Sequence, residues 1–137
     1  DHPFFKKMGV DEQGKASKTG YCTLATWDHA SLIGVRLYTG RQHQIRVHMA
    51  HIGHPLIGDE LYGGNRTFPR QALHSYFCRL THPQKNESMD LSADLPEDFQ
   101  RYLQTQPQPH SIDHNVDMSC SARPWNPRTW LSKIRTV

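Results

Sequence analysis

The chain has 137 residues, a length that allows one small domain. Hydrophobic residues make up 36% of it and the mean hydropathy is −0.73, so we expect a modest core. The formal net charge of +3 is compatible with a nucleic-acid partner but not diagnostic of one. No apolar run approaches the roughly 18 residues of a membrane helix, so we expect no membrane partner.

The chain contains three cysteines, Cys22, Cys78 and Cys120, which are widely separated and form no Cys-x-x-Cys pair. This spacing favours reduced thiols over a disulfide framework or a zinc site. We therefore expect a cytoplasmic protein, or an organellar one if the source is a eukaryote.

Two strands are predicted near the start of the chain. Residues 1–18 are polar and irregular, and their lysines fit either a solvated loop or a basic loop near phosphates. Residues 19–27 alternate between apolar and polar types, residues 28–31 have turn composition, and residues 32–38 alternate again. This pattern predicts an antiparallel hairpin.

The later part of the chain predicts one more strand and one more helix. Residues 71–80 alternate in the manner of a strand. Asp94 precedes a proline at the expected first turn of a helix and is its predicted N-cap. The apolar stripe of this helix consists of Phe99, Tyr102 and Leu103.

The stretch from Leu37 to Pro55 is the densest in polar, hydrogen-bonding side chains. A strand ends there, a tight corner follows at Thr39 and Gly40, and a short helix comes next. Core packing does not require five such residues in six positions, whereas a site for a polar, anionic ligand does. The five are Arg41, Gln42, His43, Gln44 and Arg46.

Local rules predict where this helix begins and ends. Thr39 and Gln42 have the spacing of a capping box, which predicts a helix start at Thr39. Gly53 has the position of a C-terminal glycine, beyond which the helix stops. The predicted apolar stripe consists of Ile45, Met49 and Ile52.

The segment Thr39–His48, with the sequence TGRQHQIRVH, resembles the third conserved motif of the RluA/RluD-type pseudouridine synthases. Upstream, Gly14–Ala16 and Thr19–Tyr21 resemble the segment before the two strands in this family. The resemblance continues, in order and with similar spacing, through Ile52–Pro55, Gly58–Asp59, Leu61–Gly63, Leu73–His74, His82–Pro83 and Leu95–Phe99. It covers about residues 1 to 103.

The resemblance implies an α+β fold, with a mixed, mostly antiparallel sheet and a few short helices. It divides the chain into residues 1–106, the C-terminal portion of a catalytic domain, and residues 107–137, an unmatched tail that is either disordered or extended. The family carries its catalytic aspartate in a His-Arg-Leu-Asp motif and a pocket tyrosine in a Lys-x-Tyr motif. Both motifs are absent from this sequence. We therefore expect a missing N-terminal half of the domain to be a partner of this chain.

The family breaks the bond between N1 of uracil and the ribose and rejoins the base through C5, without a metal or an organic cofactor. The resemblance therefore implies an RNA partner, ribosomal or transfer RNA, and no metal. It assigns Arg46 the supporting role of pairing with an aspartate outside this chain, because a guanidinium favours the ionised carboxylate. It places Ile45 at the pocket floor and gives RNA contacts to Arg41, His43 and Gln44.

Other polar residues have less specific roles. Asp59 could be catalytic in principle, but closing a turn is the favoured role. The histidines at 43, 48, 51 and 54 cluster in sequence without a His-Glu-x-x-His pattern, which disfavours a metal site. For His51 and His54 we expect structural hydrogen bonds at the end of the helix.

Three hypotheses remain open from the sequence. The first is an RNA pseudouridine synthase of which this chain supplies the basic, RNA-binding part of the active site, the chain alone being inactive. The second is a non-catalytic RNA-binding remnant of the family. The third is a fragment without independent function, because an incomplete sheet leaves unpaired edges.

Overall fold

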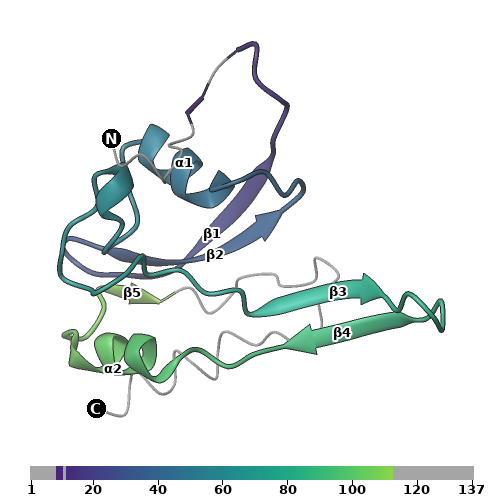
Figure 1. The fold of residues 1–137 in the computed structure, drawn as a ribbon. Coiled ribbons are helices and arrows are strands. Elements are labelled where there is room, and N and C mark those ends of the chain that lie inside the picture. Colours follow the sequence, from purple (N-terminus) through teal and green to yellow (C-terminus); the bar gives the residue numbers. More distant parts are fainter. Residues whose placement is uncertain (1–8, 11, 113–137) are drawn as a thin grey trace. The chain divides into compact units, whose positions relative to one another are not determined.

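The computed structural model describes residues 9–10 and 12–112 (Figure 1). Its elements, in chain order, are β1 (Thr19–Thr26), β2 (Ser31–Leu37), α1 (Gln44–His51), the 3₁₀-helix η1 (Glu60–Tyr62), β3 (Phe77–Thr81), β4 (Ser88–Ser92), α2 (Glu97–Thr105) and β5 (Ser111–Ile112). The mixed α+β class expected from the sequence is confirmed. The expectations for residues 1–8, Cys120 and residues 113–137 lie outside the described part of the chain.

The described strands form two small sheets. The first has the order β2-β1-β5, and the second is the two-stranded ribbon of β3 and β4, drawn in green in Figure 1. The predicted hairpin of residues 19–38 is confirmed by β1 and β2. At the other edge of β1, Ala25 pairs antiparallel with Ile112. The indole Nε1 of Trp27 donates to the carbonyl of Pro107 at 2.7 Å, so the first residues of the unmatched tail join this sheet.

The chain divides into two compact units that interleave in sequence. The first unit takes the described residues up to 22 together with 34–73, and the second takes 23–33 together with the described residues from 74 onward. The buried apolar side chains of the first unit are Val47, Met49, Tyr62 and Phe68. Those of the second unit are Leu24, Ala25, Trp27, Phe99 and Leu103.

The start of α1 differs from the prediction. The helix begins at Gln44, and its N-cap His43 lies in the left-handed region with φ 55° and makes no capping hydrogen bond with its side chain. The hydroxyl of Thr39 does not cap a helix, because it accepts the backbone N–H of Lys18 at 2.9 Å and donates to the side chain of Gln44 at 2.7 Å. The capping-box prediction was therefore wrong, because the hydroxyl of Thr39 is hydrogen-bonded to Lys18, just before β1.

The buried face of α1 also differs from the predicted apolar stripe. Val47 and Met49 are buried, whereas Ile52, a predicted stripe residue, is 49% exposed. The predicted helix end is confirmed, because Gly53 has φ 87° and its N–H donates to the carbonyl of Ala50 at 3.0 Å.

The predicted strand over residues 71–80 is shorter in the structure. Only its last part enters β3, because the N–H of Ala72 donates to the carbonyl of Ile57 and that of Leu73 to Gln71. β4 was not predicted, although its five residues SMDLS alternate between polar and apolar types, and it pairs antiparallel with β3. Pro96, not Asp94, is the N-cap of α2.

Two further findings bear on the opening expectations. Cys22 and Cys78 are free thiols. Among the described residues, every helix is too short or too polar to cross a bilayer.

Candidate functional site

Arg46 and Asp59 form a paired guanidinium and carboxylate inside the first unit. Arg46 is the third residue of α1, and its Nε and Nη2 donate to the two carboxylate oxygens of Asp59 at 2.9 and 2.8 Å. The side chain of Asp59 is 1% exposed and that of Arg46 is 15% exposed. The sequence assigned Arg46 to an aspartate outside this chain, but the carboxylate that it binds here lies thirteen residues further along the same chain.

The hydrogen bonds to Asp59 raise the pKa of the Arg46 guanidinium, and the opposing effect of partial burial is smaller. Arg46 therefore stays charged throughout the physiological pH range. Both oxygens of Asp59 accept charge-assisted hydrogen bonds, which makes the contact strong and fixes the plane of the guanidinium.

The aromatic ring of Tyr62 also contacts the guanidinium of Arg46. The Cζ of Arg46 lies 5.1 Å from the ring centroid of Tyr62, within the range of a cation–π contact. The Tyr62 hydroxyl is 2.9 Å from Nδ1 of His43, and the two rings meet edge to face. Arg46 is thus held by a carboxylate and by an aromatic ring that His43 in turn anchors.

The turn that carries Asp59 is built on two glycines. A Cβ at Gly58, which has φ 78°, would lie 1.9 Å from the carbonyl oxygen of Arg70, and one at Gly64 would lie 2.0 Å from that of Leu56. The N–H of Gly64 donates to the carbonyl of Asp59 at 2.7 Å. The turn-closing role expected for Asp59 is confirmed, and the ion pair adds a second role that the sequence did not reveal.

Comparison with known proteins identifies relatives of this chain, although no family model matches it. It is 43% identical over 111 residues to the ribosomal large subunit pseudouridine synthase D of Haemophilus influenzae, covering 70% of this chain and 34% of that protein. It is 43% identical over 109 residues to the protein of the same name from Pseudomonas aeruginosa, covering 69% and 34%. An uncharacterized RNA pseudouridine synthase of Chloroflexus aurantiacus is 41% identical over 100 residues, covering 71% and 32%.

The chain belongs to the RluA/RluD family of pseudouridine synthases. It spans about a third of the length of the curated relatives that it matches. Arg46, Asp59 and Tyr62 all lie in the segments through which the sequence resembles this family. This resemblance was the signal in the sequence that could have drawn attention to Asp59.

Gln44 holds the loop that leads into α1. Its Oε1 accepts from the hydroxyl of Thr39 at 2.7 Å and from the N–H of Arg41 at 3.0 Å. Its Nε2 donates to the carbonyl of Lys18 and to the hydroxyl of Thr19, both at 2.9 Å. Because the amide is 5% exposed and each of its hydrogen-bonding positions is filled, an RNA contact would require it to give up one of these bonds.

The other predicted RNA and pocket residues lie at different depths. Arg41 is exposed and makes no salt bridge with another described residue, so its side chain is available to an anion. His43 is half-buried against Tyr62, and Ile45 is half-buried on α1. The RNA contacts of Arg41, His43 and Gln44 and the pocket role of Ile45 stay predictions.

The histidines of α1 and its C-terminal turn do not share one role. His48 bonds the hydroxyls of Ser17 at 3.0 Å and Thr19 at 2.7 Å, which ties α1 to the start of β1. His51 and His54 are exposed and make no side-chain hydrogen bond to another described residue, but the backbone N–H of His54 donates to the carbonyl of Met49 at 2.9 Å at the end of the helix. The described part of the chain holds no group of three metal-ligating side chains.

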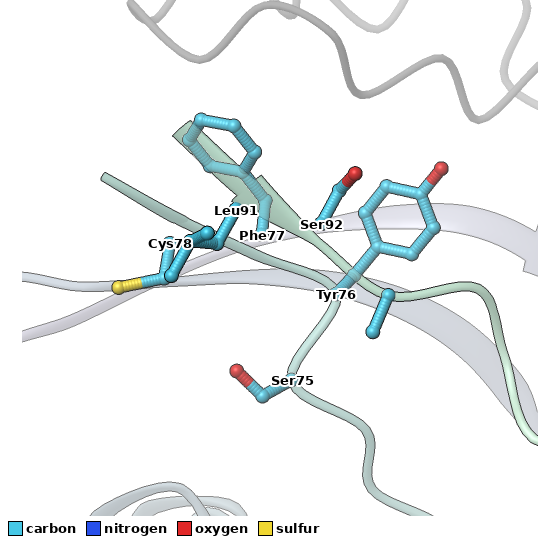
Figure 2. A pocket seen from close by; sticks show the side chains of 7 residues that line it. Ser75, Tyr76, Phe77, Cys78, Leu91 and Ser92 are labelled. Atoms are coloured by element: carbon cyan, nitrogen blue, oxygen red, sulfur yellow. The ribbon is translucent and has the colours of Figure 1, made fainter. Parts of the chain in front are cut away.

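A shallow pocket of about 210 Å³ lies in the second unit, at the start of β3 and the end of β4. Figure 2 shows the side chains of Tyr76, Phe77 and Ser92 on one side of the ribbon and Ser75 on the other. Its lining has no charged side chain. The pocket therefore lacks the charge that a phosphate or a reacting carboxylate would need.

Proposed function

We propose that this chain forms part of the active site of an enzyme that isomerises uridine to pseudouridine in structured RNA, ribosomal or transfer RNA. The names of the relatives support the reaction, and the geometry around Arg46 supports the part that this chain plays in it.

One observation carries the proposal, namely the fixed and incompletely used guanidinium of Arg46. Asp59 takes Nε and Nη2, whereas Nη1 donates to no group among the described residues. The side chain is still 15% exposed. Because one edge of the planar guanidinium is already fixed, its other edge can donate to a second acceptor at little further entropic cost.

The second acceptor that we propose is the catalytic carboxylate of the family. A carboxylate in a closed pocket tends to take up a proton, and a guanidinium beside it opposes this. The target uridine must leave its stack before such a pocket can reach it. The carboxylate bonds to C1′ as the N1–C1′ bond breaks, and the base then turns. C5 bonds to C1′ as the carboxylate leaves, and the base loses the proton from C5 while N1 takes up a proton. Arg46 keeps that aspartate ionised.

Asp59 is unsuited to be the reacting aspartate. It is 1% exposed and both of its oxygens accept hydrogen bonds from Arg46. Attack on a ribose would require it to leave this pair and the turn that holds it. The reacting carboxylate therefore has to come from another segment, and on this proposal the described residues alone are inactive.

The test measures tritium release from RNA labelled at C5 of uridine. We expect release when this chain is present together with a segment bearing the His-Arg-Leu-Asp motif, and none from the chain alone. In the active assembly, Arg46→Met should lower kcat at least about 100-fold, because it removes the charge that keeps the aspartate ionised. Arg66→Met is the matched control, since Arg66 is 83% exposed and pairs only at the surface with Glu60.

Full release from a folded Arg46→Met variant would contradict the proposal. Binding of RNA by the active-site assembly without any tritium release would favour the alternative, a non-catalytic RNA-binding remnant. One observation favours that alternative: the only carboxylate bonded to Arg46 among the described residues is the inaccessible Asp59.

A further inference from the structure

Two cations flank one exposed aromatic ring directly after β2. The ring of Tyr38 is 49% exposed, the Nζ of Lys18 lies 4.7 Å from its centroid, and the Cζ of Arg36 lies 4.9 Å from it. All three residues belong to the first unit. We name Lys18, Arg36 and Tyr38 the Tyr38 cluster.

The two charges of the Tyr38 cluster lie close enough to act on the same ligand. Their distances to a common ring place them within about 10 Å of each other, about one Debye length at 0.1 M ionic strength. Asp28 is the only acidic residue between positions 13 and 58, and it pairs with His110. Lys18 makes no salt bridge with another described residue. The cluster therefore brings together two positive charges from a stretch of sequence that contains one acidic residue.

The Tyr38 cluster is attached to the loop before α1 by backbone hydrogen bonds. The N–H of Tyr38 donates to the carbonyl of Lys18 at 3.1 Å, and the N–H of Lys18 donates to the hydroxyl of Thr39 at 2.9 Å. The same Lys18 carbonyl accepts from the buried amide of Gln44. The backbone beneath the cations is thus fixed to the residues that begin the helix of Arg46.

The ring of Tyr38 also packs against Gly20 of β1. A Cβ at Gly20 would lie 3.1 Å from Cε2 of Tyr38, closer than an ordinary contact. The absence of a side chain at Gly20 therefore lets the ring lie against the strand. Lys18 and Arg36 both lie within the range of a cation–π contact with this ring.

We propose that the Tyr38 cluster binds the phosphate backbone of a single-stranded RNA segment that flanks the target uridine. The inference rests on the proposed function for its choice of RNA. Lysine and arginine side chains supply most phosphate contacts, and these contacts position the nucleic acid without reading its sequence. Paired cations around an exposed aromatic ring are also the side-chain types that single-strand-binding surfaces combine.

The test is fluorescence anisotropy of a labelled, short single-stranded RNA with the full chain, repeated over a series of salt concentrations. Each phosphate contact to a single strand contributes about 0.7 to the slope of log K against log salt concentration. We therefore expect the double variant Lys18→Gln/Arg36→Gln to lower the slope by about 1.4 and to weaken binding at least about fivefold at low salt.

Charge-matched and conservative variants make the result specific. Lys85→Gln/Arg101→Gln removes two exposed cations from the second unit and should leave the affinity within about twofold of the original chain. Lys18→Arg keeps the charge and should retain binding. Tyr38→Leu should weaken binding with little change in slope, whereas Tyr38→Phe, which keeps the ring, should not.

Several outcomes would overturn the inference. One is the absence of RNA binding at low salt, and another is an unchanged salt slope in the Lys18→Gln/Arg36→Gln variant. A third is an equal loss of affinity in the Lys85→Gln/Arg101→Gln control. The last is that polyglutamate competes as well as RNA does, which would indicate a general anion-binding surface. Unchanged thermal melts verify folding. If the cluster variants lose RNA while no assembly releases tritium, the Tyr38 cluster stands and the proposed reaction fails.

Discussion

Two arginine–aspartate pairs in this chain have nearly the same geometry and very different surroundings. Arg46 binds Asp59 through Nε and Nη2 at 2.9 and 2.8 Å, and Arg79 binds Asp90 through the same atoms at 2.6 and 3.0 Å. The first pair joins α1 to the turn before η1, with side chains 15% and 1% exposed. The second joins paired residues of β3 and β4, with side chains 48% and 41% exposed.

The difference shows that contact geometry does not determine what an ion pair contributes. Water and salt screen the exposed pair, and such pairs contribute little to stability. In the buried pair, removal of one partner leaves a charge that water cannot fully solvate. Arg46 and Asp59 therefore depend on each other, whereas Arg79 and Asp90 are separately dispensable.

The largest expected effect comes from breaking the buried pair. Asp59→Asn leaves the Arg46 guanidinium without its counter-charge in a mostly buried position, and it should lower the free energy of unfolding by about 3 kcal/mol. Urea denaturation monitored by circular dichroism, which reports on both units, measures this. The double variant Arg46→Met/Asp59→Leu should recover most of the loss, and a double variant as unstable as Asp59→Asn would contradict our account.

The next effect concerns the turn beneath the buried pair. Gly58→Ala should lower the free energy of unfolding by more than about 2 kcal/mol, because its Cβ would meet the carbonyl of Arg70 and φ is positive. Gly53→Ala is the matched control, since φ is 87° but no atom lies within 4 Å of the new Cβ. The control should lose only about 1 kcal/mol. Equal losses by thermal melting would show that the close approach does not matter.

The smallest effect is expected for the exposed pair of Arg79 and Asp90, and it is best measured through the pKa of Asp90. The hydrogen bond from Arg79 lowers the pKa of Asp90 below its ordinary value of 3.8. A lowered pKa in the folded state stabilises the protein above that ordinary value, and the contribution is lost as pH falls through the folded-state pKa. Carboxyl NMR should show this low pKa, and Arg79→Gln should restore the ordinary one with almost no change in melting temperature. A large drop in melting temperature at neutral pH would remove the contrast between the pairs.

Local sequence patterns predicted some of these elements because their causes are local. Alternation predicted β1 and β2, and the glycine at 53 predicted the end of α1. The start of α1 was missed because the hydroxyl of Thr39 bonds Lys18, which is 21 residues away. The sequence singled out Arg46 but not its partner Asp59, because a helix and a distant turn meet only in the folded chain.

The interleaving of the two units has a consequence for dissection of the molecule. The chain passes between them after residues 22, 33 and 73, and both β1 and β2 have residues in each unit. No single proteolytic cut can release either unit as one continuous polypeptide. Deletion from an end removes only part of a unit, so an autonomous half would have to be made by splicing two stretches with a new linker.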